Sequence, residues 1–116
     1  MTFQQSLDFE SRLEESKRIC AKFPDRIPVV VERSKSSPTL EQVDKPKFLA
    51  PKELTVGQFM FIIKRRLKMT SEQSLYLLAK GTVLINSSSL MRSVFDQHKD
   101  KDGFLYITYS VENTFG

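Results

Sequence analysis

The chain of 116 residues is poor in several residue types that define large protein classes, with no tryptophan, one cysteine, one histidine and four glycines. Its single cysteine, Cys20, cannot form a disulfide within the chain. This excludes the disulfide-stapled secreted domains and favours a reducing compartment. Because the only histidine, His98, is distant from Cys20 in the sequence, we also expect no Cys/His metal site. We expect Cys20 to be a small buried hydrophobic residue.

Long apolar runs are absent as well. No stretch approaches the roughly 20 apolar residues of a membrane-spanning helix, and residues 1–10 lack the basic and then apolar order of a secretory signal. These absences predict a cytoplasmic protein. The sequence shows no Gly-rich phosphate loop and no grouping of acid, base and nucleophile. We therefore expect no catalytic residue, no metal, no bound cofactor and no enzymatic activity.

The charge balance is moderately basic, with a net charge of +4. No block of five or six lysines and arginines occurs, and no strand interleaves aromatic with basic residues, so we expect no nucleic-acid partner. A small basic RNA-binding domain is the rival interpretation, and it predicts strongly salt-dependent binding. One basic face is most simply solvated, or else contacts anionic lipid headgroups or acidic partners; it comprises Lys64, Arg65, Arg66 and Lys68.

Hydrophobic residues make up 40% of the chain, which is enough for one folded domain. The β-branched run Val29-Val30-Val31 favours a strand. Thr55 and Gln58 form a capping box before an apolar stripe at helical spacing, so a helix is expected to begin there. Taken together, the patterns predict further helices at residues 6–22 and 90–98, a short helical turn before the first of these, and strands at residues 27–32, 47–51, 74–79 and 104–109.

This order predicts an α+β protein, a ubiquitin-like β-grasp with a four-stranded mixed sheet and an N-terminal helical extension. We expect the extension to span residues 1–24, the β-grasp core residues 25–111, and a flexible C-terminal tail residues 112–116. The tail ends in Gly116. A terminal glycine has no Cβ, so its backbone can enter a narrow active-site channel where the carboxylate is activated and passed to an amine.

Five sequence stretches resemble one known family. They read DRIPVV (25–30), DKPKFLAP (44–51), LTVGQF (54–59), HKDKDGFLY (98–106) and ENTFG (112–116). With them, the chain resembles the autophagy ubiquitin-like modifiers, the group of microtubule-associated-protein light chain and GABA-receptor-associated protein, over essentially its whole length.

The resemblance implies a role as a conjugated modifier. In this family the glycine that matches Gly116 is joined through its carboxyl to the amino group of phosphatidylethanolamine, after activating and conjugating enzymes have passed it on by thioester transfer. A processing and deconjugating cysteine protease would be a further partner, and the lipid would anchor the protein to autophagosomal membranes. Whether an extension once followed Gly116 stays open, as does the role of the N-terminal segment, where Phe3 and Leu7 could serve membrane contact or self-association.

The resemblance also implies capture of receptors and adaptors that carry an aromatic-x-x-aliphatic motif. The peptide would add as a strand beside residues 47–51. The implied aromatic pocket comprises Glu15, Ile19, Pro28, Val30, Lys47, Leu49 and Phe104, the implied aliphatic pocket Phe48, Ala50, Pro51, Leu54, Phe59 and Ile62, and the charged peptide contacts Arg26, Lys45, Lys47 and Arg66.

Ala50 stands where the family usually has valine, which predicts a roomier aliphatic pocket. The alternative function is a cytosolic peptide-binding adaptor of the same fold that is not conjugated.

Overall fold

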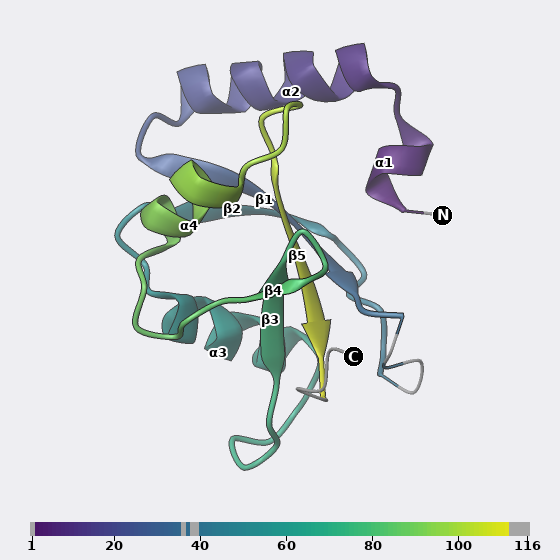
Figure 1. The fold of residues 1–116 in the computed structure, drawn as a ribbon, viewed down its shortest axis with the longest axis vertical. Helices are drawn as coiled ribbons and strands as arrows, with labels where there is room; N and C mark the ends of the chain where they lie inside the picture. Colours follow the sequence, from purple (N-terminus) through teal and green to yellow (C-terminus); the bar gives the residue numbers. More distant parts are fainter. Residues whose placement is uncertain (1, 36, 38–39, 112–116) are drawn as a thin grey trace.

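The computed structural model describes residues 2–35, 37 and 40–111. Two helices lie along one side of a sheet and two more lie on or beside its other side (Figure 1). In chain order the elements are α1 (Phe3–Ser6), α2 (Phe9–Lys22), β1 (Arg26–Arg33), β2 (Lys47–Pro51), α3 (Val56–Arg66), β3 (Tyr76–Ala79), β4 (Val83–Leu84), α4 (Met91–His98) and β5 (Leu105–Ser110).

The sheet is mixed and has five strands in the order β2-β1-β5-β3-β4. Strands β1 and β5 run parallel at its centre, and the other pairs are antiparallel. The expected number of four strands was wrong by one, because Val83 and Leu84 pair with the end of β3. The turn between β3 and β4 has positive φ at Lys80 and Gly81, a geometry that folds the chain tightly back on itself.

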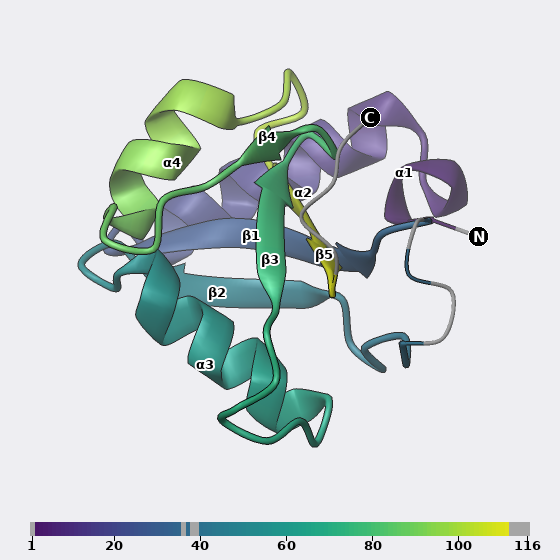
Figure 2. The same cartoon turned by 60° about the horizontal axis from the view of Figure 1, so that its bottom comes forward.

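The central strand β1 is buried on both faces. Its alternating residues Ile27, Val29 and Val31 join the main core with α3, α4 and β5. Val30 points to the opposite face and packs with Phe3 and Phe104 under the N-terminal helices. Figure 2 shows α3 and α2 on opposite sides of the sheet that contains β1. The run of β-branched residues is therefore apolar on both sides because both sides are covered.

Helix α3 begins as the sequence predicts. The Thr55 hydroxyl accepts from the Gln58 backbone N–H at 3.1 Å, and the Gln58 side chain accepts from the Thr55 N–H at 2.9 Å. The expected apolar stripe faces the sheet, with Val56, Phe59 and Ile63 buried. This part of the chain, from the cap to the buried face, follows directly from local sequence.

The N-terminal segment follows expectation in one respect and departs from it in two. The expected short helical turn is helix α1, but α2 begins at Phe9, where the Asp8 side chain caps it, and not at residue 6. Cys20 is exposed, so the expectation of a buried cysteine was wrong. Ser16 is the buried residue of α2 instead, because this helix docks through polar contacts that the apolar spacing did not reveal.

Asp102 makes these polar contacts. Its side chain is fully buried and accepts from the Arg12 guanidinium at 2.8 Å, the Tyr106 hydroxyl at 2.5 Å and the Phe104 backbone N–H at 2.9 Å. The Ser16 hydroxyl donates to the Asp102 carbonyl oxygen at 2.5 Å. Burial, and then the bond to Asp102, raise the pKa of the Tyr106 hydroxyl well above its usual range, so tyrosine stays the donor.

A small side chain is required where α2 meets the loop before β5. Gly103 has φ +88°, and a Cβ placed there would lie 2.3 Å from the Ser16 Oγ. The loop can thus bring the Asp102 carboxylate against α2 only because position 103 carries no side chain. The contact joins residues that are far apart in the sequence and holds the N-terminal extension on the sheet.

We expect Asp102→Ala to lower the free energy of unfolding by about 3 kcal/mol, because it leaves the Arg12 guanidinium and the Phe104 N–H without their buried acceptor. Chemical denaturation measures the loss. The matched control is Glu53→Ala, which removes an ion pair with Arg92 whose two side chains are 71% and 47% exposed, and should cost less than about 1 kcal/mol. Equal losses in the two variants would contradict this account.

Candidate functional site

Strand β2 is the outer strand on one side of the sheet, so one of its edges carries no partner strand within the described part of the chain. This strand begins at Lys47 and ends at Pro51. A lysine and a proline at an exposed edge both discourage pairing with further copies of the sheet. A free edge of this kind can still accept one extended peptide as an additional strand.

The two faces of β2 lead to different surroundings. Lys47 and Leu49 pair with Val30 and Pro28 of β1 and share their face, which α1 and α2 cover. Phe48 and Ala50 lie on the opposite face, which α3 covers. Side chains alternate along a strand, so the expected aromatic and aliphatic pockets fall on opposite faces of one edge.

On the α3 face, the chain forms a hollow of about 310 Å³. Phe59 and Ala50 are buried and form its floor, whereas Phe48, Leu54 and Ile62 are only partly buried. The rings of Phe48 and Phe59 meet edge to face with centroids 5.6 Å apart. The hollow is lined by all the residues expected for the aliphatic pocket, Phe48, Ala50, Pro51, Leu54, Phe59 and Ile62, together with Arg26, Lys47, Leu49 and Arg66.

On the α2 face, Val30 and Phe104 are buried, and Ile19 of α2 packs against them. Pro28 is also buried, while Leu49 keeps part of its side chain exposed. We call these residues the apolar wall beside the edge strand. Of them, Ile19 and Leu49 reach the surface, and their use as an aromatic pocket stays a prediction.

A charged pair lies at the same side of the edge. The Lys47 ammonium of β2 bonds to the Glu15 carboxylate of α2. The lysine side chain is 48% exposed, so the pair is accessible to solvent. An entering aromatic side chain would have to share space with this pair, and an acidic neighbour in the peptide could replace Glu15 as the partner of Lys47.

Cations surround the groove. Arg26 and Arg66 line the hollow, and the Arg66 guanidinium lies 5.1 Å from the centroid of the Phe48 ring. Arg26 also donates to the Leu49 carbonyl at 3.2 Å. Lys45 is exposed in the segment before β2 and is not among the residues that line the hollow. This charge distribution favours peptides with acidic residues beside their anchors.

The remaining sequence expectations concern the C-terminal tail, metal binding and membrane spans. Gly116 and the tail from residue 112 lie outside the described residues. Among residues 2–35, 37 and 40–111, no three histidine, cysteine or acidic side chains gather as they would around a metal ion. In the same ranges, every helix is too short or too polar to cross a membrane.

Comparisons with known proteins agree with the fold. A family described as "Autophagy protein Atg8 ubiquitin like" matches residues 11–116. The chain belongs to the Atg8 family of autophagy ubiquitin-like proteins. It is 46% identical to Autophagy-related protein 8a of Arabidopsis thaliana over 99% of this chain and 93% of that protein. It is also 46% identical to Autophagy-related protein 8 of Eremothecium gossypii, over 99% and 94%.

A solved Atg8 structure has the same fold. The crystal structure of Trypanosoma brucei ATG8 superposes with a TM-score of 0.90 at 36% identity, over 100% of this chain and 98% of that one. The ubiquitin-like fold with N-terminal helices is thereby confirmed for this Atg8 protein.

The sequence analysis did not assign Phe3 to the aromatic side of the edge strand. The Phe3 ring of α1 is 9% exposed and packs edge to face on Phe104, with centroids 5.1 Å apart. The Lys47 ammonium lies 5.8 Å from the centroid of the Phe3 ring, and the Phe3 backbone N–H donates to the Glu32 carboxylate of β1 at 2.9 Å. The suggestion that Phe3 could serve membrane contact or self-association is therefore wrong for this buried ring. No local pattern could have revealed a contact with residues so distant in the sequence.

We expect Phe3→Ala in this Atg8 protein to weaken binding of an aromatic-x-x-aliphatic peptide by roughly tenfold, because the wall beside Phe104 loses its support. Fluorescence titration with the peptide, and with a version that carries alanine in place of the aromatic anchor, separates the two pockets. Phe9→Ala, which removes a ring that is 40% exposed on α2, is the control and should change neither affinity. An equal loss for both peptides would show a general disturbance instead.

We expect Ala50→Val to reduce the affinity for peptides with leucine or isoleucine at the aliphatic anchor several-fold, while a valine anchor is little affected. Ala50 is 3% exposed and forms part of the floor of the hollow, so two added methyl groups take up room that a larger anchor needs. Calorimetric titration of the three peptides gives the ranking. The prediction of a roomier hollow is wrong if the wild-type protein already binds the peptide with a valine anchor more tightly than those with leucine or isoleucine.

Proposed function

We propose that this Atg8-family protein is a modifier that is conjugated through the carboxyl of Gly116 to phosphatidylethanolamine and that recruits proteins through the groove at β2. The observation that supports it most is the position of β2: a free edge with an apolar wall on one face and a 310 Å³ hollow on the other. The expected location is the cytoplasm and, after conjugation, the autophagosomal membrane.

The spacing of the recognised motif fits this edge. In an added strand, positions i and i+3 point to opposite faces because side chains alternate. An aromatic residue directed to the α2 face therefore places an aliphatic residue three positions later over the α3 face, where the hollow opens between Phe48, Leu54 and Ile62. A spacing of i and i+2 or i+4 would direct both anchors to the same face.

The affinity expected for a peptide in this groove suits reversible binding. One fully buried aliphatic or aromatic side chain contributes about 1.5–3 kcal/mol, and backbone hydrogen bonds along β2 add to both anchors. A dissociation constant in the micromolar range, or roughly −8 kcal/mol, is then expected. Arg26, Lys47 and Arg66 add preference for acidic flanks.

Conjugation uses the chain as a substrate. The Gly116 carboxylate attacks ATP to form an acyl adenylate with release of pyrophosphate, and an enzyme cysteine displaces AMP to give a thioester. The amine of phosphatidylethanolamine then attacks the thioester carbonyl, loses a proton and releases the thiol, which leaves an amide.

The lipidation assay tests the proposal. The protein is incubated with ATP, the family's activating and conjugating enzymes and phosphatidylethanolamine liposomes, next to Gly116→Ala. We expect a mobility-shifted, membrane-bound band for the wild type and its loss in the variant, because the bulkier terminal residue fits the narrow enzyme channel poorly.

Ile62→Glu is the matched control, since it places a charge in the peptide hollow and should leave conjugation in place while it abolishes peptide binding. If the enzymes act on another family member but do not shift this chain, the non-conjugated peptide-binding adaptor becomes the better account.

A further inference from the structure

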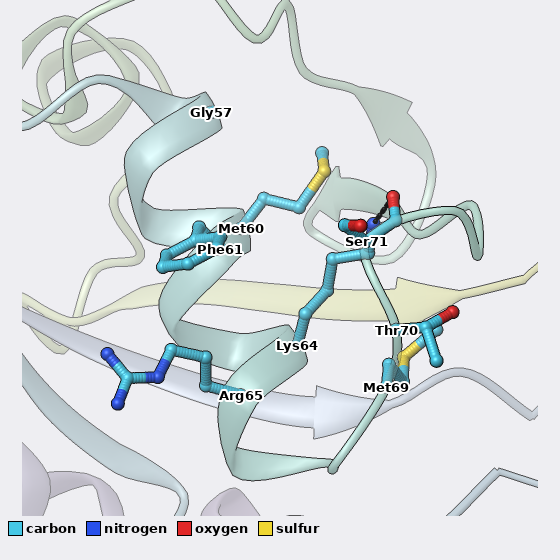
Figure 3. A pocket seen from close by; sticks show the side chains of 8 residues that line it. All are labelled: Gly57, Met60, Phe61, Lys64, Arg65, Met69, Thr70 and Ser71. Carbon is cyan, nitrogen blue, oxygen red and sulfur yellow. Dashed lines mark hydrogen bonds between the residues drawn. The ribbon is translucent and has the colours of Figure 1, made fainter.

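A second hollow lies on the outer side of α3, away from the β2 groove (Figure 3). It has a volume of about 190 Å³. One wall is α3 and the other is the connector that follows it. The lining residues are Gly57, Met60, Phe61, Lys64, Arg65, Met69, Thr70 and Ser71.

The hollow is held open by contacts within the chain. The Lys64 ammonium donates to the Ser71 carbonyl at 3.3 Å, which ties the connector to the helix. Met60 and Met69 are partly buried and pack against the main core. Two flexible thioether side chains can adapt to an incoming apolar group, a property common at surfaces that bind several partners.

The rim of this hollow is apolar and cationic. Phe61 is 55% exposed, the largest fraction among the large hydrophobic residues of the described chain. The Arg65 guanidinium lies 5.9 Å from the centroid of its ring. The lining contains Lys64 and Arg65 and no carboxylate. By charge complementarity, the fitting occupant is an acidic segment with one apolar anchor, and a concave site suits a side chain better than a flat membrane.

This hollow connects to the β2 groove over the surface of α3. Ile62, Arg65 and Arg66 line a further hollow that shares residues with both sites. Ile62 and Arg66 also line the β2 hollow, and Arg65 also lines the outer one. A single extended chain can therefore pass from one hollow to the other along a cationic path.

The direction of the bound peptide decides which flank takes this path. The aromatic wall lies beside Lys47 and Leu49, and the aliphatic hollow extends to Pro51 and Leu54. A motif with the aromatic residue first thus runs in the same direction as β2. Residues after the aliphatic anchor then emerge over α3, next to Ile62. Half the circumference of a helix about 10–12 Å across is about 17 Å, or roughly five extended residues.

We propose that the acidic segment that follows the aliphatic anchor crosses α3 and places a second apolar side chain in the hollow beside Phe61. Its carboxylates face Arg65 and Arg66 on the way. The inference rests on the proposed peptide binding at β2 and extends it, since it adds a third anchor to the two of the motif. Ligands would then be distinguished by their C-terminal flank as well as by the motif itself.

Titration with four synthetic peptides tests this. The core peptide carries only an aromatic-x-x-aliphatic motif. The second continues after the motif with five residues rich in glutamate and then leucine, the third ends in alanine instead of leucine, and the fourth carries the leucine extension before the motif. We expect the second peptide to bind wild type about tenfold more tightly than the third and fourth, the gain of one largely buried aliphatic side chain.

Protein variants show which residues produce this gain in affinity. Phe61→Ala and Arg65→Glu should remove it, whereas both variants keep the affinity for the core peptide within about twofold. The controls are Phe9→Ala, which removes another exposed ring, and Arg18→Glu, which makes the same charge change on the exposed face of α2. Both controls should retain the full gain.

Other outcomes overturn the inference. If the leucine and alanine extensions bind alike, or the N-terminal extension gains as much, attraction between charges alone explains the effect. If Phe61→Ala keeps the gain but weakens binding to phosphatidylserine-containing vesicles, the outer face of α3 contacts membranes instead. Binding of the core peptide without any gain overturns the third anchor alone, while failure of the core peptide to bind overturns the groove at β2 as well.

Discussion

The burial of β1 on both faces is the constraint on which the rest of the structure depends. Its apolar residues must be covered twice, by α3 and α4 on one side and by α1 and α2 on the other. The parallel pairing with β5 places β1 near the centre of the sheet and leaves β2 outermost. Because each covering layer reaches the edge at β2, the same strand has an apolar wall on one face and a hollow on the other.

The N-terminal layer is held by polar contacts as well as by its apolar cluster. Asp102 is fully buried and gathers Arg12, Tyr106 and the Phe104 N–H around one carboxylate. A buried carboxylate is tolerated only when it is paired and hydrogen-bonded in this way. The contact brings Phe3 and Ile19 against Phe104. The helical extension is therefore part of the candidate peptide site and also covers the sheet.

The two hollows of α3 differ in how they relate to the fold. The one at β2 is formed where core side chains such as Phe59 reach the surface, so its shape is coupled to stability. The outer one is formed by exposed or half-buried side chains around Phe61, and of these Met60 and Met69 also pack against the core. Arg65 and Arg66, which belong to the basic face that the sequence left as either solvated or a contact for anionic partners, lie between the two hollows.

Local sequence patterns determined the fold class of this protein and the family that it resembles. The capping box at Thr55, the β-branched run of β1 and the strand-helix order were sufficient to predict the ubiquitin-like fold, and the motif stretches indicated the family. The positions expected to line the aliphatic pocket do lie around one hollow. These features depend on residues that are neighbours in sequence or on strand and helix periodicity, which a sequence displays directly.

Tertiary structure alone decided the rest. Two residues are too few to show a strand pattern, so β4 exists only through its pairing with β3. Cys20 is exposed and Ser16 buried because α2 docks on Asp102, 86 residues after Ser16. Phe3 joins the aromatic wall through β1 and β5, and the hollow beside Phe61 depends on how the connector returns to α3. Such contacts form when segments that are distant in the sequence pack together. The spacing of residues within one segment does not reveal which other segment it will contact.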